Sequence, residues 1–138
     1  MSEALEEISE TLTIKSQEKN FVEQISEVEG LDVQTGLTYC VNDPDFYKEM
    51  LQEYLSSDKQ AKLEQFFAHE DWENYRIIVH ALKSTSLTIG ATHLSEQAKA
   101  LEQAAKSGDV PYLHMHHQTV MDEYADLTDR LTRLFDLF

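Results

Sequence analysis

The chain has 138 residues, of which 41% are hydrophobic and 27% are charged, as expected for one soluble domain with its own core. Eleven basic and 26 acidic residues give a net charge of −15, which disfavours contact with nucleic acids and anionic lipid surfaces. The longest apolar runs, such as Ile77–Val79, are too short to cross a membrane, and the first residues are acidic where a secretory signal carries basic ones. We therefore expect a cytoplasmic protein that binds neither nucleic acid nor membranes.

Helical spacing of apolar residues runs through the chain, which holds only four glycines and two prolines. Residues 1–29 are rich in acidic and polar side chains and are expected to form an acidic linker or a flanking helix that ends at Gly30. Residues 32–40 predict a second short helix, in which the single cysteine, Cys40, should be a small buried hydrophobe. The other residues of this piece that can turn inward are Val33, Leu37 and Tyr39.

Asp43 and Pro44 indicate the start of a long helix, because aspartate accepts hydrogen bonds from free N–H groups and proline fits the first helical position. The polar residues 56–58 can bend this helix. The residues expected on its buried side are Phe46, Met50, Tyr54, Leu55, Leu63, Phe66 and Phe67.

Residues 71–90, 91–108 and 109–135 predict three further helices, with aspartate at two of the starts and glycine at two of the ends. Because the breaks between helices are short, neighbouring helices must turn back on one another. We therefore predict an all-α fold, with an antiparallel up-down-up-down four-helix bundle over residues 30–138 and short helical segments before it. A monomer is expected.

The helix predicted over residues 71–90 carries the chemistry. A helical wheel at about 100° per residue gives it one core face. The residues on that face are Tyr75, Ile78, Leu82, Thr85 and Ile89. His80 lies nearly opposite the centre of this face, so its ring should stand in water. Its neighbours on the exposed side are Arg76, Lys83, Ser84 and Leu87.

His80 and these neighbours form a coherent docking face, although an exposed histidine alone does not indicate a function. Neutral imidazole is a nucleophile near neutral pH without help from a metal, and a ring mounted on a helix can enter a partner's active site. Lys83, one turn on, can place its ammonium beside a transferred phosphoryl group. Ser84 leaves a gap next to the ring, and Leu87 offers an exposed apolar contact.

One stretch resembles the signature of histidine-containing phosphotransfer (HPt) domains, in which His-x-Leu-Lys-Gly precedes a Gly-Ala turn and a leucine-spaced helix. It reads His80-Ala-Leu-Lys83-Ser-Thr-Ser-Leu-Thr-Ile-Gly90-Ala91, followed by Leu94 and Leu101-Glu102. The segment from Gly30 to Cys40, with Asp45-Phe-Tyr-Lys after it, resembles the one these domains carry ahead of their bundle. The resemblance spans about residues 28–137.

The resemblance implies a phosphorelay carrier without catalytic activity of its own. His80 would take a phosphoryl group from an aspartate of a response-regulator receiver domain and pass it to another receiver. Lys83 would steady that group, and Lys106 on the facing helix would assist. The receiver would contribute Mg²⁺ and an acidic pocket, so no metal or other cofactor is expected in this chain. A hybrid sensor histidine kinase is a further expected partner, with the chain either free-standing or the end of such a kinase.

Ser84 departs from the resemblance, because the family usually has glycine there. Its hydroxyl could narrow the approach to the ring or donate a hydrogen bond to the phosphoryl oxygens. An alternative function is therefore a helical-bundle scaffold that binds receiver or kinase domains without accepting phosphate.

A third hypothesis is a metal-binding bundle that uses the cluster of His114, His116 and His117, in which His114 and His117 are three residues apart. These two histidines share a helix face, but they lack a fixed carboxylate and could equally be surface residues. A di-metal carboxylate centre would need Glu-x-x-His on two helices, and a hydrolase would need a nucleophile in a Gly-flanked elbow. The sequence has neither pattern.

Overall fold

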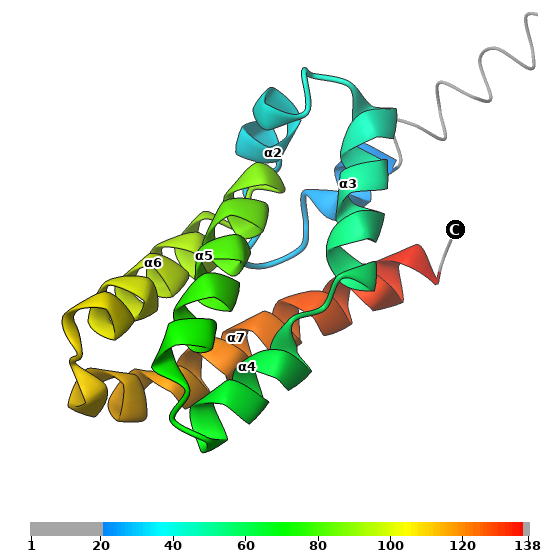
Figure 1. The fold of residues 1–138 in the computed structure, drawn as a ribbon. Coiled ribbons are helices and arrows are strands. Elements are labelled where there is room, and N and C mark those ends of the chain that lie inside the picture. Colours follow the sequence, from blue (N-terminus) through cyan, green and yellow to red (C-terminus); the bar gives the residue numbers. More distant parts are fainter. Residues whose placement is uncertain (1–20, 137–138) are drawn as a thin grey trace, which may run out of the picture.

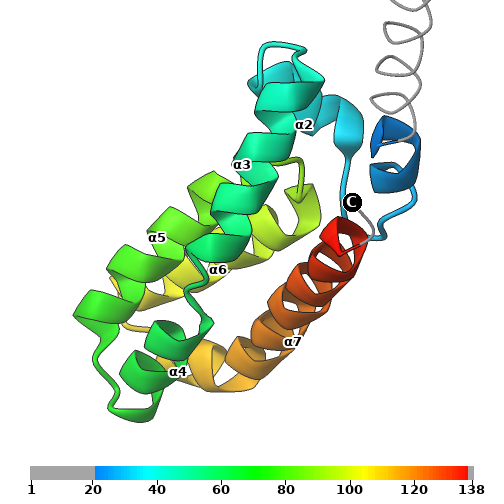
Figure 2. The ribbon, with the colours of Figure 1, turned by 90° about the vertical axis from the view of Figure 1, so that its right-hand side faces the viewer.

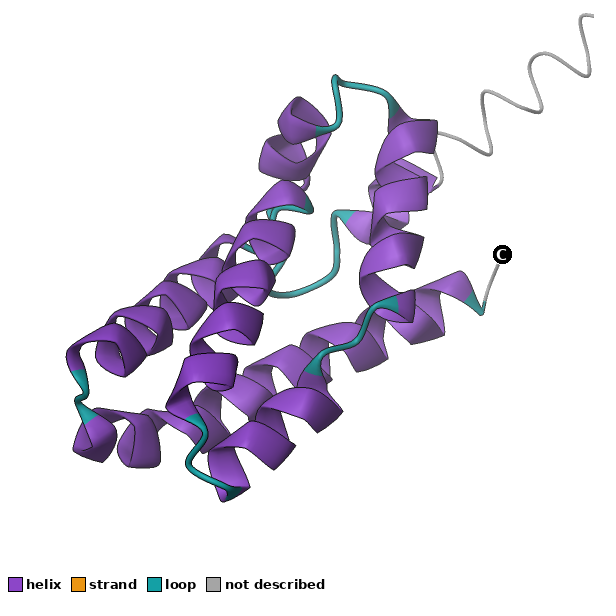
Figure 3. Cartoon of the chain, viewed as in Figure 1, coloured by secondary structure: helices purple, strands orange, loops and turns teal. Residues whose placement is uncertain are grey.

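The computed structural model describes residues 21–136, and every regular element among them is a helix (Figures 1 and 3). The helices are α2 (Val33–Tyr39), α3 (Pro44–Ser56), α4 (Gln60–Ala68), α5 (Trp72–Thr88), α6 (Thr92–Ser107) and α7 (Val110–Phe135). Residues 21–25 form one further helical stretch. None of the described helices is long and apolar enough to cross a membrane. The prediction of an all-α bundle is confirmed.

Aspartate side chains cap the start of four helices, as their positions in the sequence predict. The carboxylates of Asp32, Asp43, Asp71 and Asp109 each accept a hydrogen bond from a backbone N–H in the first turn. At the end of α6, Gly108 adopts a left-handed φ of 73°, which stops that helix. These local signals fix the boundaries of the bundle.

The long helix expected after Asp43 is two helices, α3 and α4, with a break at residues 57–59. Three consecutive polar side chains account for the break. Ser56 Oγ donates to the carbonyl of Glu53, and Asp58 Oδ1 accepts from the N–H of Gln60, so side chains compete for the backbone groups that a continuous helix needs.

The chain reverses direction between α4 and α5, between α5 and α6, and between α6 and α7 (Figure 1). Helix α5 packs most extensively against α6, while α7 packs against α6, α3 and α4. The stretch of residues 21–25 lies beside the C-terminal end of α7 (Figure 2). There the rings of Phe21 and Phe135 have centroids 5.9 Å apart. A domain boundary between residues 29 and 30 stays a prediction, and residues 1–20 lie outside the described residues.

Helix α2 is held tightly against the end of α5. The N–H of Asp32 donates to the carbonyl of Gly90 at 2.7 Å, and the Tyr47 hydroxyl donates to the carbonyl of Ile89 at 2.8 Å. A Cβ at Gly90, where φ is +91°, would lie 2.1 Å from the carbonyl oxygen of Asp32, and one at Gly36 would lie 2.5 Å from that of Ile89. Only glycine fits either position, so α2 fixes the C-terminal end of α5.

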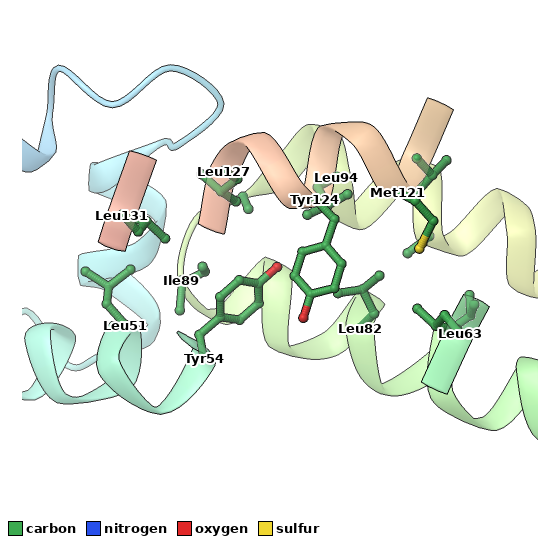
Figure 4. Packing of buried hydrophobic residues seen from close by; sticks show 14 of the residues in the cluster. Leu51, Tyr54, Leu63, Leu82, Ile89, Leu94, Met121, Tyr124, Leu127 and Leu131 are labelled. Atoms are coloured by element: carbon green, nitrogen blue, oxygen red, sulfur yellow. The ribbon is translucent and has the colours of Figure 1, made fainter. Parts of the chain in front are cut away.

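The core lies between α3, α4, α5, α6 and α7, and Figure 4 shows part of it. Tyr54 and Tyr124 face each other there with ring centroids 5.8 Å apart. Both hydroxyls have partners, Ser86 Oγ at 2.9 Å and the N–H of Lys59 at 3.0 Å, because a buried hydroxyl without one is costly. Cys40 is buried as predicted, and burial raises the pKa of its thiol.

Several predicted core positions are shifted by one residue along the chain. Phe46 and Tyr39 are exposed, whereas their neighbours Tyr47 and Cys40 are buried. On α5 the fully buried residues are Tyr75, Val79, Leu82, Ser86 and Ile89, while Ile78 and Thr85 are only partly buried. Buried hydrogen bonds explain part of the shift, because inward rotation lets the Tyr47 hydroxyl reach Ile89 and lets Ser86 reach Tyr54.

Candidate functional site

His80 lies on the exposed face of α5, as the helical wheel predicts. Its side chain is 60% exposed, and the core side of the same helix points the other way. Leu87 and Ile77, which flank it on α5, are both exposed apolar residues. A ring in this position can be reached by another protein, with apolar surface on either side of it.

A buried carboxylate that the sequence analysis did not select, Glu102 on α6, holds the ring of His80. Glu102 is only 3% exposed, and its Oε2 lies 2.7 Å from Nδ1 of His80. This hydrogen bond joins two adjacent helices and restricts rotation of the ring. Buried carboxylates are rare unless they are paired, so the pairing of this one with an exposed histidine makes the position a candidate site.

Two lysines share the other oxygen of the same carboxylate. Lys83 Nζ lies 3.3 Å and Lys106 Nζ lies 3.1 Å from Oε1 of Glu102. Burial by itself would raise the pKa of the Glu102 carboxyl, but hydrogen bonds from Lys106, His80 and Lys83 outweigh it and lower the pKa below its ordinary value. Glu102 is therefore ionised at neutral pH, with a positive charge from each of two helices next to the ring.

The ionised state of Glu102 determines which nitrogen of the neutral His80 ring is reactive. A carboxylate can only accept hydrogen bonds, so Nδ1 of His80 must be the donor. In the neutral ring the lone pair is then on Nε2, the nitrogen that Glu102 does not contact. The site therefore presents a fixed nucleophilic nitrogen to solvent, with two ammonium groups nearby.

Three other predicted site residues, Ser84, Arg76 and Lys106, lie on the same two helices as His80 and Glu102. Ser84 is exposed, and its hydroxyl donates to the backbone carbonyl of His80 at 3.3 Å, so it is turned along the helix. Arg76 is partly buried one turn before His80. Lys106 reaches the site through Glu102, one turn before it on α6.

A signal for Glu102 was present in the sequence. The apolar stripe of its helix runs through Leu94, Ala98 and Leu101, and Glu102 is one turn after Ala98, on the edge of that stripe. Lys106 follows it at the spacing of a helical ion pair. A carboxylate at the border of a core face, with a cation one turn on, is a candidate for a buried polar network.

The histidines of α7 at positions 114 and 117 have different partners. His117 is buried, which corrects the expectation that it could be a surface residue, and its Nδ1 lies 2.8 Å from the Tyr75 hydroxyl. His114 is exposed and pairs with Glu70 at 3.1 Å. Within residues 21–136 no group of three or more histidine, cysteine or acidic side chains is placed to hold a metal ion.

The part of the chain that carries these residues matches a known protein family. Residues 47–136 match the Hpt domain family, which covers α3 from its first turn through to the end of α7 and includes His80, Lys83, Glu102 and Lys106. Neither the comparison with curated proteins nor that with solved structures gives a match. Because the match spans well over half of the chain, the protein belongs to the Hpt domain family, whose role is histidine phosphotransfer in two-component signalling.

Proposed function

We propose that His80 is the phosphoryl-accepting residue of a phosphorelay carrier, which takes the group from a receiver-domain aspartate and delivers it to another receiver. The observation that carries the proposal is the contact between His80 Nδ1 and the buried Glu102 carboxylate. It leaves Nε2 as an exposed nucleophile in a fixed orientation, on a chain whose family transfers phosphoryl groups through histidine.

The transfer step uses the site as follows. The Nε2 lone pair forms a bond to phosphorus while the bond from phosphorus to the aspartyl oxygen breaks, and the aspartate leaves as a carboxylate. The imidazole then carries a positive charge with its proton on Nδ1, and Glu102 stabilises that charge at 2.7 Å. The reverse sequence passes the group to the next aspartate, with the imidazole leaving as a neutral ring.

Lys83 and Lys106 provide the counter-charge for the phosphoryl oxygens. Both ammonium groups already lie at Oε1 of Glu102, so a small rotation of either side chain can bring it toward the transferred group. Arg76 adds a further positive charge one turn away on α5. This arrangement concentrates cations at His80 in a chain with a net charge of −15.

The proposed partners are receiver domains and a hybrid sensor histidine kinase, which fits the family. The receiver supplies the metal ion and the acidic pocket, and this chain contributes the histidine and the docking face, so it is a carrier and no enzyme. Ile77, Leu87 and Ser84 form the apolar and small surface onto which a receiver docks. A cytoplasmic monomer is part of the same proposal.

A scaffold that binds receivers without accepting phosphate is the second candidate, and Ser84 is the observation that favours it. Serine adds a hydroxyl beside the ring where the resemblance leads us to expect glycine. Its hydrogen bond to the His80 carbonyl turns it away from Nε2, which weighs against a silenced site.

A phosphorylated receiver labelled on phosphorus tests the proposal. The label should reach the wild type and be acid-labile and base-stable, as phosphohistidine is, and it should be absent from His80→Gln. The matched control is His93→Gln, because His93 is a similarly exposed histidine that pairs with a glutamate, Glu123. Label on His80→Gln at the wild-type level would show that the acceptor lies elsewhere. Binding of receivers without any label on the wild type would favour the scaffold.

A further inference from the structure

Helix α4 is attached to the bundle through a row of polar side chains on α7. His114, His117 and Tyr124 lie on one face of α7, and each contacts the segment that contains α4. Tyr124 accepts from the N–H of Lys59, His117 faces Glu64 at 3.4 Å, and His114 pairs with Glu70 at 3.1 Å. Two of the three attachments are therefore imidazoles that face glutamates.

His117 is the central one of these attachments and is buried, with 1% of its surface exposed. Its ring stacks on Phe67 of α4 at a centroid distance of 3.9 Å and an interplanar angle of 4°. Its Nδ1 lies 2.8 Å from the Tyr75 hydroxyl of α5, so one side chain joins three helices. Its Nε2 is buried, lies 3.4 Å from Oε1 of Glu64 and makes no hydrogen bond.

These contacts define which nitrogen of the neutral ring carries the hydrogen. An unprotonated Nε2 would turn its lone pair toward the carboxylate of Glu64, which is repulsive, so Nε2 carries the hydrogen. Nδ1 then accepts from the Tyr75 hydroxyl. Burial lowers the pKa of His117 below its ordinary 6.5, so the ring is neutral at neutral pH. A second proton would have to enter on Nδ1, where the Tyr75 hydroxyl donates to the neutral ring.

The other contacts of α4 are apolar and aromatic packing against α5 and α7, including Phe67 with Trp72 and Tyr75. Helix α4 has nine residues and no side-chain hydrogen bond at its N-cap, and Leu63 is its one fully buried residue. Phe66 and Phe67 are only partly buried against the core. Because a short helix is marginal without tertiary packing, the His117 contacts make a large contribution to its attachment.

We propose that α4 is a pH-sensitive latch, which opens from α5 and α7 when His117 takes up a proton while the rest of the bundle stays folded. A protonated ring would place a positive charge in a buried position, and the Tyr75 hydroxyl would have to turn its hydrogen away from Nδ1 into an apolar surrounding. Both changes disappear when α4 opens and the ring reaches water.

The charged and titratable groups around His117 act in opposite directions. They are Glu64 on α4, Tyr75 on α5, and His114 on α7 with its partner Glu70. Burial lowers the pKa of His117 below its ordinary 6.5, Glu64 opposes this and His114 adds to it, and the lowering prevails. The open form therefore binds more protons than the closed form below about pH 6.5, so closure is complete above this pH and weakens as the pH falls.

Hydrogen exchange of the full chain, followed by mass spectrometry from about pH 7.5 to about pH 5 and corrected for intrinsic rates, tests the latch. The opening constant of α4 should rise as the pH falls, by at most about tenfold per pH unit for one proton. Peptides from α6 serve as the internal reference and should show no such rise. His117→Gln should abolish the pH dependence and Glu64→Gln should strengthen it. The matched control is His93→Gln, an exposed histidine outside this row of α7, which should keep the pH dependence.

Equal pH dependence in α4 and α6, or an unchanged slope in His117→Gln, would overturn the proposal. Should His117→Gln not fold, NMR titration of the wild-type ring gives the same decision. Titration of His117 must then coincide with the shift of the α4 amide signals. A ring that titrates while α4 stays protected would refute the latch.

Discussion

His80 and His117 each make a short hydrogen bond through Nδ1, 2.7 Å and 2.8 Å long, but the two rings differ in exposure and in the kind of partner they have. His80 is exposed and its partner is a buried carboxylate, which accepts and so leaves the lone pair of the ring on the outer nitrogen. His117 is buried, which lowers its pKa, and its partner is a phenol, which donates to the neutral ring inside the bundle. The partner and the exposure of the ring decide its chemistry.

Helix α5 contributes one residue to the core and another to the exposed site. Tyr75 and His80 are five residues apart on α5, which turns them roughly 140° from each other around the helix axis. Tyr75 therefore enters the core to meet His117, while His80 faces water and meets Glu102 of α6 at its edge. The rigid packing of α5 against α6 keeps the second contact in place.

The largest expected difference between the two histidines is in stability. His117→Ala removes a stacked buried ring and leaves the Tyr75 hydroxyl without a partner, so we expect the free energy of unfolding to fall by about 3 kcal/mol. His80→Ala removes an exposed ring and leaves Glu102 paired with two lysines, so we expect a change within about 0.5 kcal/mol. Urea unfolding near pH 7.5 measures both. Similar losses in the two variants would show that exposure does not separate these histidines.

A smaller effect is expected on reactivity when the partner of His80 changes. In Glu102→Gln the side-chain amide can donate to Nδ1 as well as accept from it, so the lone pair of the neutral ring is no longer fixed on Nε2. The substitution also removes the negative charge beside the ring. We expect phosphorylation by a small donor such as phosphoramidate to slow by about tenfold, the size of one charge-assisted hydrogen bond.

Glu96→Gln on the same helix is the matched control, because Glu96 is exposed. Its rate should equal that of the wild type. Equal rates in all three proteins would mean that the ring needs no buried carboxylate, and the role given to Glu102 in the transfer step would be wrong.

Most of the fold could be predicted from the sequence because its signals are local. Asp43, Asp71 and Asp109 start helices through hydrogen bonds that span two or three residues, and the glycines end them through backbone angles. Between α3 and α4 the sequence predicts only a bend. Whether a run of polar residues bends a helix or breaks it depends on tertiary contacts, such as the hydrogen bond from the Lys59 N–H to the Tyr124 hydroxyl.

The exposed half of the site was predictable, whereas the sequence indicates its buried half only as a polar position at the edge of a core face. The position of His80 follows from the 3.6-residue period of its own helix. Glu102 is 22 positions further along the chain, and the usual rule that charges stay outside the core argues against its burial. The burial of His117 depends in the same way on Phe67 and Tyr75, which the sequence does not place beside it.

The smallest expected effect concerns Ser84, the residue closest to the ring that departs from the HPt signature. Its hydroxyl is bonded to the His80 carbonyl, so replacing it should leave the transfer rate within about twofold of the wild type in both Ser84→Gly and Ser84→Ala. Helix propensity predicts opposite changes in stability, a loss of about 0.5 kcal/mol for glycine and a gain of similar size for alanine. Urea unfolding and labelling by one phosphorylated receiver measure the two properties separately.

A faster rate in Ser84→Gly alone would show that the side-chain carbon limits the approach of the receiver. A faster rate in both variants would show that the hydroxyl limits it. Either result would show that the residue at position 84, in addition to Glu102, determines how fast His80 reacts.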